Sequence, residues 1–169
     1  MMSFIKHKAG APKKVKVGII TVSSTRTIKD DKSGHWIGKQ IKKEGHEVVF
    51  HRVVPDDAET VNRTVVDAVR DYKPEAILLS GGTGISPKDV TIEAVRPLFE
   101  KELTAFGPLF TQLSFEEIDS AALLSRATAG LYANTVLFCM PGSLQACKLA
   151  CKALILPELG HLVGHVHEA

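Results

Sequence analysis

Short runs of apolar residues alternate with longer segments of helical periodicity along most of this chain. The short runs are rich in β-branched and aliphatic residues, which is typical of buried parallel strands. We expect strands at residues 15–22, 46–54, 76–79 and 135–139. In the longer segments, apolar residues recur on one face at the spacing of a helix. We expect helices at residues 33–44, 59–72, 91–124 and 144–156, with breaks at Pro97 and Gly107-Pro108 and a last helical stretch from Pro157.

Strands that alternate with helices of this length predict one doubly wound α/β domain. Its fold class is three-layer, with a mostly parallel central sheet and helices on both faces. Because the apolar pattern begins at Val15, we expect the domain over residues 15–169, after a flexible N-terminal arm at residues 1–14. Ser33 is expected to cap the first helix and Gly45 to end it. Ligands of such sheets bind at the carboxyl ends of the strands.

Composition and charge narrow the classes of partner. The formal net charge of +2 over 169 residues is too small to indicate a nucleic-acid partner. No apolar run approaches the roughly 18 residues of a membrane span, and charged residues interrupt the N-terminus where a signal peptide would be apolar. The three cysteines are an odd number without paired spacing, which favours reduced thiols. We therefore expect a cytoplasmic protein with neither a membrane nor a nucleic-acid partner.

A glycine-rich loop, Ser80-Gly81-Gly82-Thr83-Gly84, follows the third expected strand. Three glycines in five residues allow backbone N–H groups to approach an anion without interference from Cβ atoms. The Thr83 hydroxyl adds a donor. The loop matches neither the Walker pattern nor the dinucleotide pattern. It predicts a phosphate site, and a tight exit from the strand without any ligand is the alternative.

Carboxylates follow two of the expected strands. Asp56 comes after the second strand, and Asp89 comes shortly after the glycine-rich loop. A carboxylate beside a phosphate is repelled unless a cation lies between them, and Mg²⁺ is commonly bound by one or two carboxylates plus phosphate oxygens. We therefore expect Asp56 and Asp89 to bind Mg²⁺, with the capping of helices as the alternative. For the neighbouring Asp57, capping is the favoured role.

A second candidate anion site lies at Met140-Pro141-Gly142-Ser143, between the last expected strand and the helix after it. The N–H groups and the dipole at the start of a helix attract anions. Ser143 can cap the helix, donate to a phosphate, or do both. Arg126, next to Ser125, carries a planar fork of donors suited to phosphate, and an ordinary surface arginine is the alternative. Two anion sites with carboxylates between them indicate metal-assisted phosphoryl or nucleotidyl transfer.

These motifs resemble those of the molybdenum-cofactor biosynthesis family that includes MoaB, MogA and the G domain of gephyrin. The resemblance runs from about Val15 to His161 and is closest to the MoaB branch. Its motifs stand here as Ser80-Gly81-Gly82-Thr83-Gly84, Asp89-Val90-Thr91, Ser125-Arg126-Ala127-Thr128-Ala129-Gly130 and Met140-Pro141-Gly142-Ser143. Two departures, Ile92 and Leu144, fall where relatives often have proline.

The resemblance implies the activity of a molybdopterin adenylyltransferase. In that activity the terminal phosphate of molybdopterin attacks the α-phosphate of ATP with Mg²⁺, which gives adenylyl-molybdopterin and pyrophosphate. Catalytic and metal-binding roles are implied for Asp56 and Asp89, because active members carry aspartates at both positions. Substrate-binding roles are implied for Ser80, Gly81, Gly82, Thr83, Gly84, Ser125, Arg126, Gly142 and Ser143.

We expect the ATP phosphates at the glycine-rich loop and the pterin phosphate near Ser143 and Arg126. The family also implies a homo-oligomer, either a trimer or a hexamer. A non-catalytic molybdopterin-binding or carrier protein of the same fold is the alternative to the enzyme, and a scaffolding module is a third hypothesis for the function.

Overall fold

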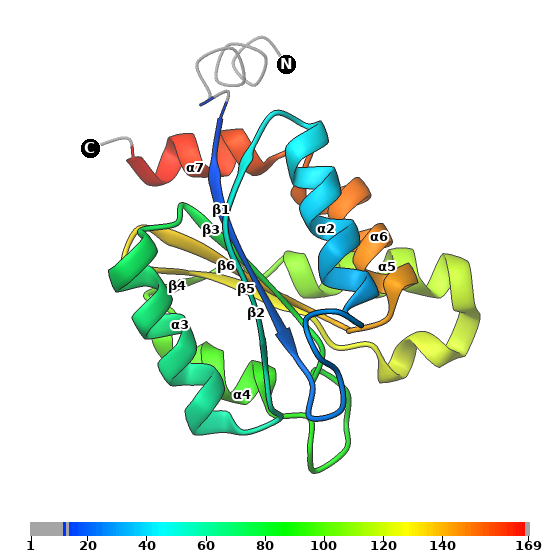
Figure 1. The fold of residues 1–169 in the computed structure, drawn as a ribbon. Helices are drawn as coiled ribbons and strands as arrows, with labels where there is room; N and C mark the ends of the chain where they lie inside the picture. The colour runs from blue at the N-terminus through cyan, green and yellow to red at the C-terminus, as the bar shows by residue number, and fades with distance from the viewer. Residues whose placement is uncertain (1–11, 13, 168–169) are drawn as a thin grey trace, which may run out of the picture.

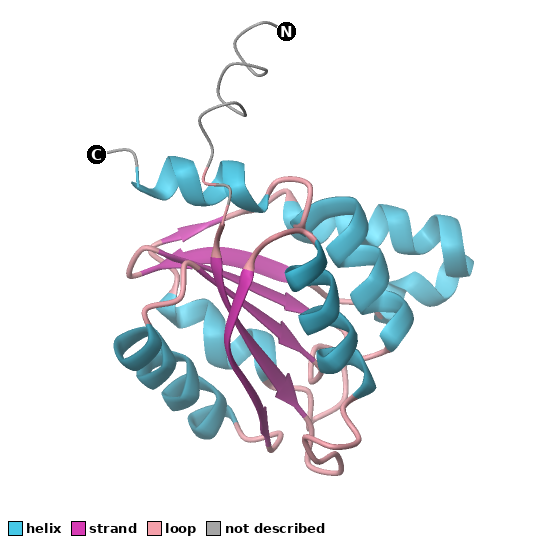
Figure 2. Cartoon of the chain, turned by 45° about the horizontal axis from the view of Figure 1, so that its top comes forward, coloured by secondary structure: helices cyan, strands magenta, loops and turns pink. Residues whose placement is uncertain are grey.

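The structure of the chain is a computed structural model that describes residues 12 and 14–167. Residues 1–11, 13, 168 and 169 lie outside the described part, and so does most of the N-terminal arm expected at residues 1–14. The described residues form a central six-stranded sheet with helices on both faces (Figure 1). The three layers are visible in Figure 2, and the predicted α/β class is confirmed.

The sheet is parallel except at one strand. Its strands are β1 (Lys16–Val22), β2 (Glu47–Val54), β3 (Ala76–Ser80), β4 (Lys101–Glu102), β5 (Thr128–Tyr132) and β6 (Thr135–Met140). They lie in the order β2-β1-β3-β6-β5-β4, and β5 is antiparallel to both of its neighbours. From β1 the chain goes first to β2 on one side and then to β3 on the other. Ligands of such sheets bind in a crevice at this kind of switch, here at the carboxyl ends of β1 and β3.

Helices cover the two faces of the sheet unequally. They are α2 (Lys32–Lys43), α3 (Ala58–Tyr72), α4 (Thr91–Val95), α5 (Phe106–Ile118), α6 (Leu144–Ala150) and α7 (Leu159–His167). The 3-10 turns η1 (Arg96–Leu98) and η2 (Asp119–Leu124) and the π-helical turn η3 (Cys151–Ile155) extend three of them. In Figure 1, α2, α6 and α7 lie on one face, whereas α3 and α4 lie on the other. No single helix among the described residues could cross a membrane; one bent pair, Leu144–Ile155 with Leu159–His167, passes by length and composition only.

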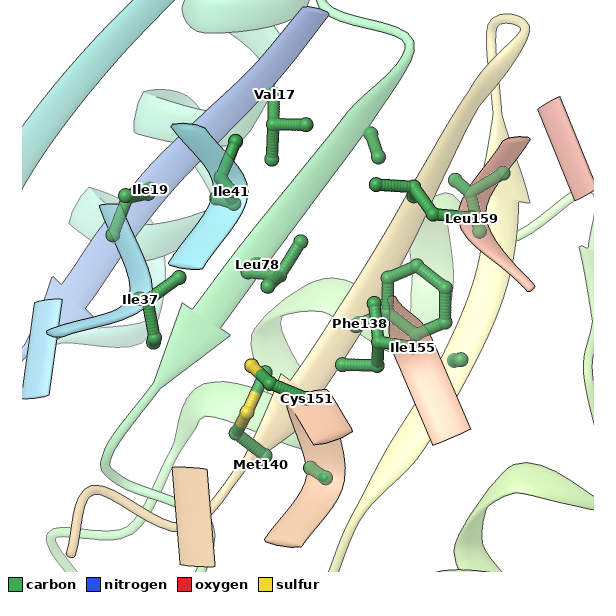
Figure 3. Close-up of a cluster of buried hydrophobic side chains, with 14 of the residues drawn as sticks. Val17, Ile19, Ile37, Ile41, Leu78, Phe138, Met140, Cys151, Ile155 and Leu159 are labelled. Atoms are coloured by element: carbon green, nitrogen blue, oxygen red, sulfur yellow. The ribbon is translucent and has the colours of Figure 1, made fainter. Parts of the chain in front are cut away.

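Two apolar clusters hold these layers to the sheet. Ile19 and Ile20 are neighbours on β1, both are fully buried, and they belong to opposite clusters. Figure 3 shows the first cluster, in which Ile37 and Ile41 of α2 lie over the sheet beside Ile19 and Leu78. Side chains of consecutive strand residues point to opposite faces, so burial of both faces requires an unbroken apolar run. That requirement explains the near-continuous apolar sequences of β1 and β3.

The first helix is capped by Asp31 and not, as expected, by Ser33. The Asp31 Oδ1 atom accepts a hydrogen bond from the Gly34 N–H at 3.0 Å, and the helix begins at Lys32. Ser33 lies within the first turn of the helix, and its hydroxyl donates to the Gly142 carbonyl instead. The expected end of the helix is confirmed, because Gly45 follows it with a φ of +86°. Asp57 caps α3 through the Thr60 N–H, as its sequence position predicts.

The predicted helix at residues 91–124 is wrong in its middle, and β5 was not predicted at all. The segment breaks after α4 and η1 into the short strand β4 before α5 begins. β5 occupies Thr128–Tyr132, which includes the second half of the motif at residues 125–130. It turns into β6 at Ala133 and Asn134, whose φ angles of 45° and 62° are those of a type I′ hairpin turn.

Candidate functional site

The two predicted anion loops lie against one another at the carboxyl edge of the sheet. The glycine-rich loop follows β3, and residues 141–143 follow the adjacent β6. The Gly81 N–H donates to the Met140 carbonyl at 3.0 Å. A Cβ atom on Gly142 would lie only 2.9 Å from the Gly81 Cα atom. Glycine at 142 therefore permits the two loops to touch.

The carbonyl groups of the glycine-rich loop are held by two residues from distant parts of the chain. Thr91 binds the first two carbonyls. Its hydroxyl donates to Gly81 O at 2.7 Å, and its N–H donates to Gly82 O at 2.9 Å. Arg126 binds the next two carbonyls, because its Nε–H is shared between Thr83 O at 2.9 Å and Gly84 O at 3.1 Å. Four consecutive carbonyls are thus fixed by the body of the domain.

The amide groups of the same peptide units point the other way. In a trans peptide the C=O of one residue and the N–H of the next are antiparallel, and the described residues contain no cis peptide bond. The N–H groups of residues 82–85 donate to no acceptor in the part of the chain that the structure describes. Successive N–H groups of this kind form an anion-binding concavity. The loop therefore presents unpaired donors of the kind that bind phosphate, and phosphate binding stays a prediction.

Thr83 adds a second sign of a ligand. The residue is 2% exposed, and its Oγ1 atom is the one buried side-chain polar atom among the described residues that has no hydrogen-bond partner. A buried hydroxyl without a partner is unfavourable, so such groups indicate a partner that binds there. A phosphate oxygen would satisfy it.

Glycine is required at two positions of this loop by its backbone. Gly81 and Gly82 have φ angles of +97° and +63°, which residues with a Cβ atom rarely adopt. A Cβ on Gly81 would also lie 2.3 Å from the Val22 carbonyl oxygen. The loop conformation thus depends on glycine for space as well as for backbone freedom.

Asp56 lies beside the middle of the glycine-rich loop, and Asp89 lies beside its last residue. A Cβ on Gly82 would be 3.5 Å from Asp56 Oδ1, and a Cβ on Gly84 would be 2.7 Å from Asp89 Oδ2. Each carboxylate is oriented by one backbone N–H: Ser24 donates to Asp56 Oδ2 at 2.7 Å, and Ser86 donates to Asp89 Oδ2 at 2.9 Å. The structure therefore brings both predicted carboxylates to the predicted phosphate loop.

Two carboxylates next to a phosphate receptor fit Mg²⁺ better than they fit a metal held wholly by protein. No group of three or more His, Cys, Asp or Glu residues that could hold a metal occurs within residues 14–167. Mg²⁺ keeps several water molecules and takes one or two carboxylates together with phosphate oxygens. The donors present here match that pattern.

In the loop after β6, the Ser143 hydroxyl and the Gly142 carbonyl already form hydrogen bonds within the protein, which the sequence did not indicate for Gly142. Ser143 Oγ accepts from the Ala146 N–H at 3.1 Å and caps α6, which is one of its two predicted roles. The Gly142 carbonyl accepts from Ser33 Oγ at 3.0 Å and from Arg26 Nη1 at 3.2 Å. Arg26 was not predicted as a site residue, and no local pattern singles it out because its partner lies 116 residues away.

The remaining predicted residues belong to the half of the site built around the glycine-rich loop. Arg126 lies beneath that loop, and its guanidinium is also paired with Glu93. Ser125 lies next to it at the end of η2, where its N–H donates to Ala122 O at 2.9 Å. Ser80 is buried at the end of β3 with its Oγ 3.4 Å from Thr21 Oγ1. No described contact joins Arg126 to Ser143.

A groove of about 630 Å³ adjoins the site at Asp56. It opens between the loop after β1 and the edge strand β2, and its lining includes Ser23, Ser24 and Arg26. Ser24 joins the groove to Asp56 through two hydrogen bonds, because the Asp56 N–H also donates to Ser24 Oγ at 3.0 Å. Hydroxyl and guanidinium groups thus continue from the phosphate loop along this side of the crevice.

A buried polar network supports the crevice from below. Asp31 is fully buried, and its Oδ2 atom accepts from Thr21 Oγ1 at 2.5 Å and from His51 Nε2 at 2.7 Å. Burial raises the pKa of this carboxyl, but the hydrogen bonds from His51, Thr21 and Gly34 outweigh burial and lower the pKa to about 2. Asp31 is therefore charged at neutral pH, and the His51 Nε2 atom carries the proton that the two share.

The three cysteines are buried and take no part in the site's chemistry. Burial raises the pKa of Cys139 to about 12 and that of Cys147 to about 11, and it also raises the pKa of Cys151. Thiols of this kind are not ionised at neutral pH and are poor nucleophiles.

A protein family described as a probable molybdopterin binding domain matches residues 18–161 of the chain. The chain belongs to this family. Both anion loops, both carboxylates, Thr91 and Arg126 lie within the matched residues. The predicted resemblance to the molybdenum-cofactor biosynthesis proteins is confirmed.

Relatives and solved structures match this chain along nearly its whole length. Molybdenum cofactor biosynthesis protein B of Bacillus subtilis is 46% identical over 168 residues, which is 99% of each chain. A protein of Methanocaldococcus jannaschii named probable molybdopterin adenylyltransferase is 40% identical over 163 residues, with 92% of this chain and 96% of that protein covered. A crystal structure of a molybdenum cofactor biosynthesis protein B has a TM-score of 0.90 at 44% identity and covers 94% of this chain and 99% of its own.

Proposed function

We propose that the chain is a molybdopterin adenylyltransferase that uses ATP and Mg²⁺ in the biosynthesis of the molybdenum cofactor. The name of the Methanocaldococcus jannaschii relative supports this activity. The observation that carries the proposal is the glycine-rich loop, where the N–H groups of residues 82–85 and the Thr83 hydroxyl have no partner among the described residues. Two carboxylates lie beside that loop, Asp56 next to Gly82 and Asp89 next to Gly84.

The reaction exchanges one phosphoanhydride bond for another. A terminal phosphate oxygen of molybdopterin forms a bond to the α-phosphorus of ATP. The bond from that phosphorus to the oxygen that bridges to the β-phosphate breaks, and its electron pair leaves with pyrophosphate. A phosphate monoester oxygen is already a nucleophile at neutral pH, so no side chain is needed to remove a proton. The protein's task is to position the two anions and to neutralise charge.

Each part of the site serves that task. The glycine-rich loop binds phosphate oxygens of ATP through its N–H groups and the Thr83 hydroxyl. Asp56 and Asp89 hold Mg²⁺, which when bound supplies positive charge to the phosphate oxygens. The loop at Gly142 and Ser143 brings the pterin phosphate next to Gly81, because the two loops are in contact there.

The test is to incubate the protein with molybdopterin, ATP and Mg²⁺ and to assay adenylyl-molybdopterin and pyrophosphate. Asp89→Asn keeps an oxygen for the Ser86 N–H but loses the charge, and we expect it to lower turnover by about 100-fold or more. Asp57→Asn is the matched control, because Asp57 lies at the same edge of the sheet but only caps α3. We expect the control to retain its activity.

Binding of both substrates without any product would contradict the enzyme and favour a molybdopterin carrier. An equal loss of turnover in both variants would show that the effect of Asp89 is not specific to the site.

We also propose that the chain forms a homo-oligomer, a trimer or a hexamer, through an apolar face on α5 and η2. Large apolar side chains that are about half exposed or more gather there, namely Leu109, Phe115, Ile118, Leu123 and Leu124. Exposed large apolar side chains concentrated on one part of the chain indicate a site of protein association.

A further inference from the structure

Arg126 joins the glycine-rich loop to a carboxylate on α4. Its Nε–H is shared by the carbonyls of Thr83 and Gly84, while Nη1 donates to Glu93 Oε1 at 2.7 Å and Nη2 to Glu93 Oε2 at 3.3 Å. Glu93 therefore accepts two hydrogen bonds from the terminal nitrogens of the guanidinium, and this bidentate contact fixes the plane of the group. The near end of the guanidinium meets the loop, so Glu93 determines where the loop's carbonyls are held.

The ion pair itself contributes little to folding. The side chain of Arg126 is 36% exposed and that of Glu93 is 53% exposed. Pairs with this much exposure usually have small effects on stability because water screens them. The contacts with the loop are the part of the arrangement that a purely stabilising surface pair would lack. Arg96 and Glu102 form such a surface pair at 3.0 Å, and no hydrogen bond joins Arg96 to the loop.

The direction of the loop's amides follows from these contacts. Because each N–H is antiparallel to the carbonyl before it, Arg126 aims the amides of Gly84 and Ile85 away from itself. Thr91 does the same for the amides of Gly82 and Thr83. Thr91 is fully buried and acts from the core, whereas Arg126 acts from the rim and needs a second anchor. Glu93 is that anchor.

We propose that Glu93 and Arg126 form a positioning pair that presets the glycine-rich loop for the phosphates of ATP, and that Arg126 does not itself bind phosphate. The part that concerns ATP depends on the adenylyltransferase function proposed above. The pair revises the role expected of Arg126 from the sequence, where it was assigned to a substrate. A preset loop binds more tightly because its amides need no ordering when the ligand arrives.

The two roles of Arg126 predict opposite effects of Glu93→Gln. If Arg126 positions the loop, a neutral amide at 93 loosens the guanidinium, and we expect ATP to bind about tenfold more weakly. If Arg126 contacts phosphate directly, removal of the competing Glu93 carboxylate releases the guanidinium, and ATP then binds more tightly. The sign of the change in ATP affinity thus separates the two roles.

The experiment measures the dissociation constants of Mg-ATP and of molybdopterin, each alone, by calorimetry. It compares the wild type with Glu93→Gln, Arg126→Gln and the control Arg96→Gln, after thermal unfolding has shown that each variant is folded. We expect both variants of the pair to weaken ATP binding by about tenfold and to leave molybdopterin binding unchanged. The control should change neither. An unchanged or increased ATP affinity in Glu93→Gln would overturn the proposal.

A second measurement does not depend on the proposed function. Backbone amide order parameters of residues 82–85 are determined by NMR in the ligand-free protein. Glu93→Gln should lower the order parameters of Gly84 and Ile85 but not that of Ser143. A loop that loosens in a protein without adenylyltransferase activity would refute the function and keep the positioning pair. An unchanged loop in an active protein would refute the pair and keep the function.

Discussion

The buried charge of Asp31 allows a prediction of how stability depends on pH. Asp31 is 0% exposed and accepts hydrogen bonds from Thr21, His51 and the Gly34 N–H. The substitution Asp31→Asn removes the charge and one of the two acceptor oxygens while it keeps the shape of the side chain. One oxygen remains for the Gly34 N–H, so α2 retains a cap. The loss falls on the bonds to Thr21 and His51.

The pKa of Asp31 sets the size of the effect. The hydrogen bonds lower this pKa from 3.8 to about 2, despite burial, which raises it. At 1.36 kcal/mol for each pKa unit, this lowering of the pKa stabilises the fold by roughly 2–3 kcal/mol at neutral pH. Small domains have a total stability of about 5–15 kcal/mol, so the loss is easily measured.

The same pKa values fix the pH range. Because folding lowers the pKa, the stabilisation is fully present above pH 3.8 and is lost as the pH falls towards about 2. Urea unfolding followed by circular dichroism at pH 7, 5, 4 and 3 should show Asp31→Asn less stable than the wild type by roughly 2–3 kcal/mol at pH 7. That difference should narrow below pH 4. Any effect of rearranged hydrogen bonds on the neutral amide adds equally at each pH.

Asp57→Asn provides the control for this measurement. Asp57 also caps a helix, but it is exposed, and asparagine is as good a cap as aspartate. Its substitution should have a much smaller effect. A difference for Asp31→Asn that stays constant from pH 7 to pH 3, or that equals the control, would refute the argument from the buried charge.

Two further predictions concern the site and the apolar face. Thr91→Val keeps the shape of a buried side chain but leaves Gly81 O without its hydroxyl donor. We therefore expect the free energy of unfolding in urea to fall by about 1–3 kcal/mol and Mg-ATP to bind more weakly. Thr111→Val on α5 is the control, and equal effects of both substitutions would contradict the role of Thr91. Phe115→Ser should lower the molar mass measured by light scattering towards that of the 18.3 kDa monomer, whereas an unchanged assembly would exclude this part of α5 from the interface.

The sequence predicted the parallel part of the sheet well because burial of both faces leaves a strong pattern. β1, β2, β3 and β6 were placed within one or two residues of their observed ends. β5 was missed because its sequence, Thr-Ala-Gly-Leu-Tyr, contains small residues that do not favour a strand. The turn after it also lacks the usual signal, since Ala133 occupies a φ of 45° where glycine or asparagine is common. Pairing with β6 determines this strand, and such pairing is not visible in a local pattern.

The chemistry of the candidate site was predicted from residue types, whereas the partners of individual side chains were not. Asp56, Asp89 and the glycine-rich loop were expected to meet because the carboxyl ends of parallel strands share one edge. Ser33 was assigned a cap because serine is a common cap residue, and the structure gives that role to Asp31. The choice depends on His51 and Thr21, which lie 20 and 10 residues from Asp31 and supply the bonds that keep a buried carboxylate charged.

Residues from three of the sequence motifs converge on one loop. Glycines supply the backbone freedom of the loop, Thr91 of the second motif holds its first two carbonyls, and Arg126 of the third motif holds the next two. Taken singly, Thr91 and Arg126 suggest separate tasks, a helix start and an anion contact. Taken together they have the same effect, which is to turn the amides of residues 82–85 away from Thr91 and Arg126. A loop of glycines would otherwise be the most flexible part of the site, and ordering it on binding would weaken the affinity for phosphate. Thr91 and Arg126 remove that penalty in advance, which explains why a loop rich in glycine depends on rigid partners outside it.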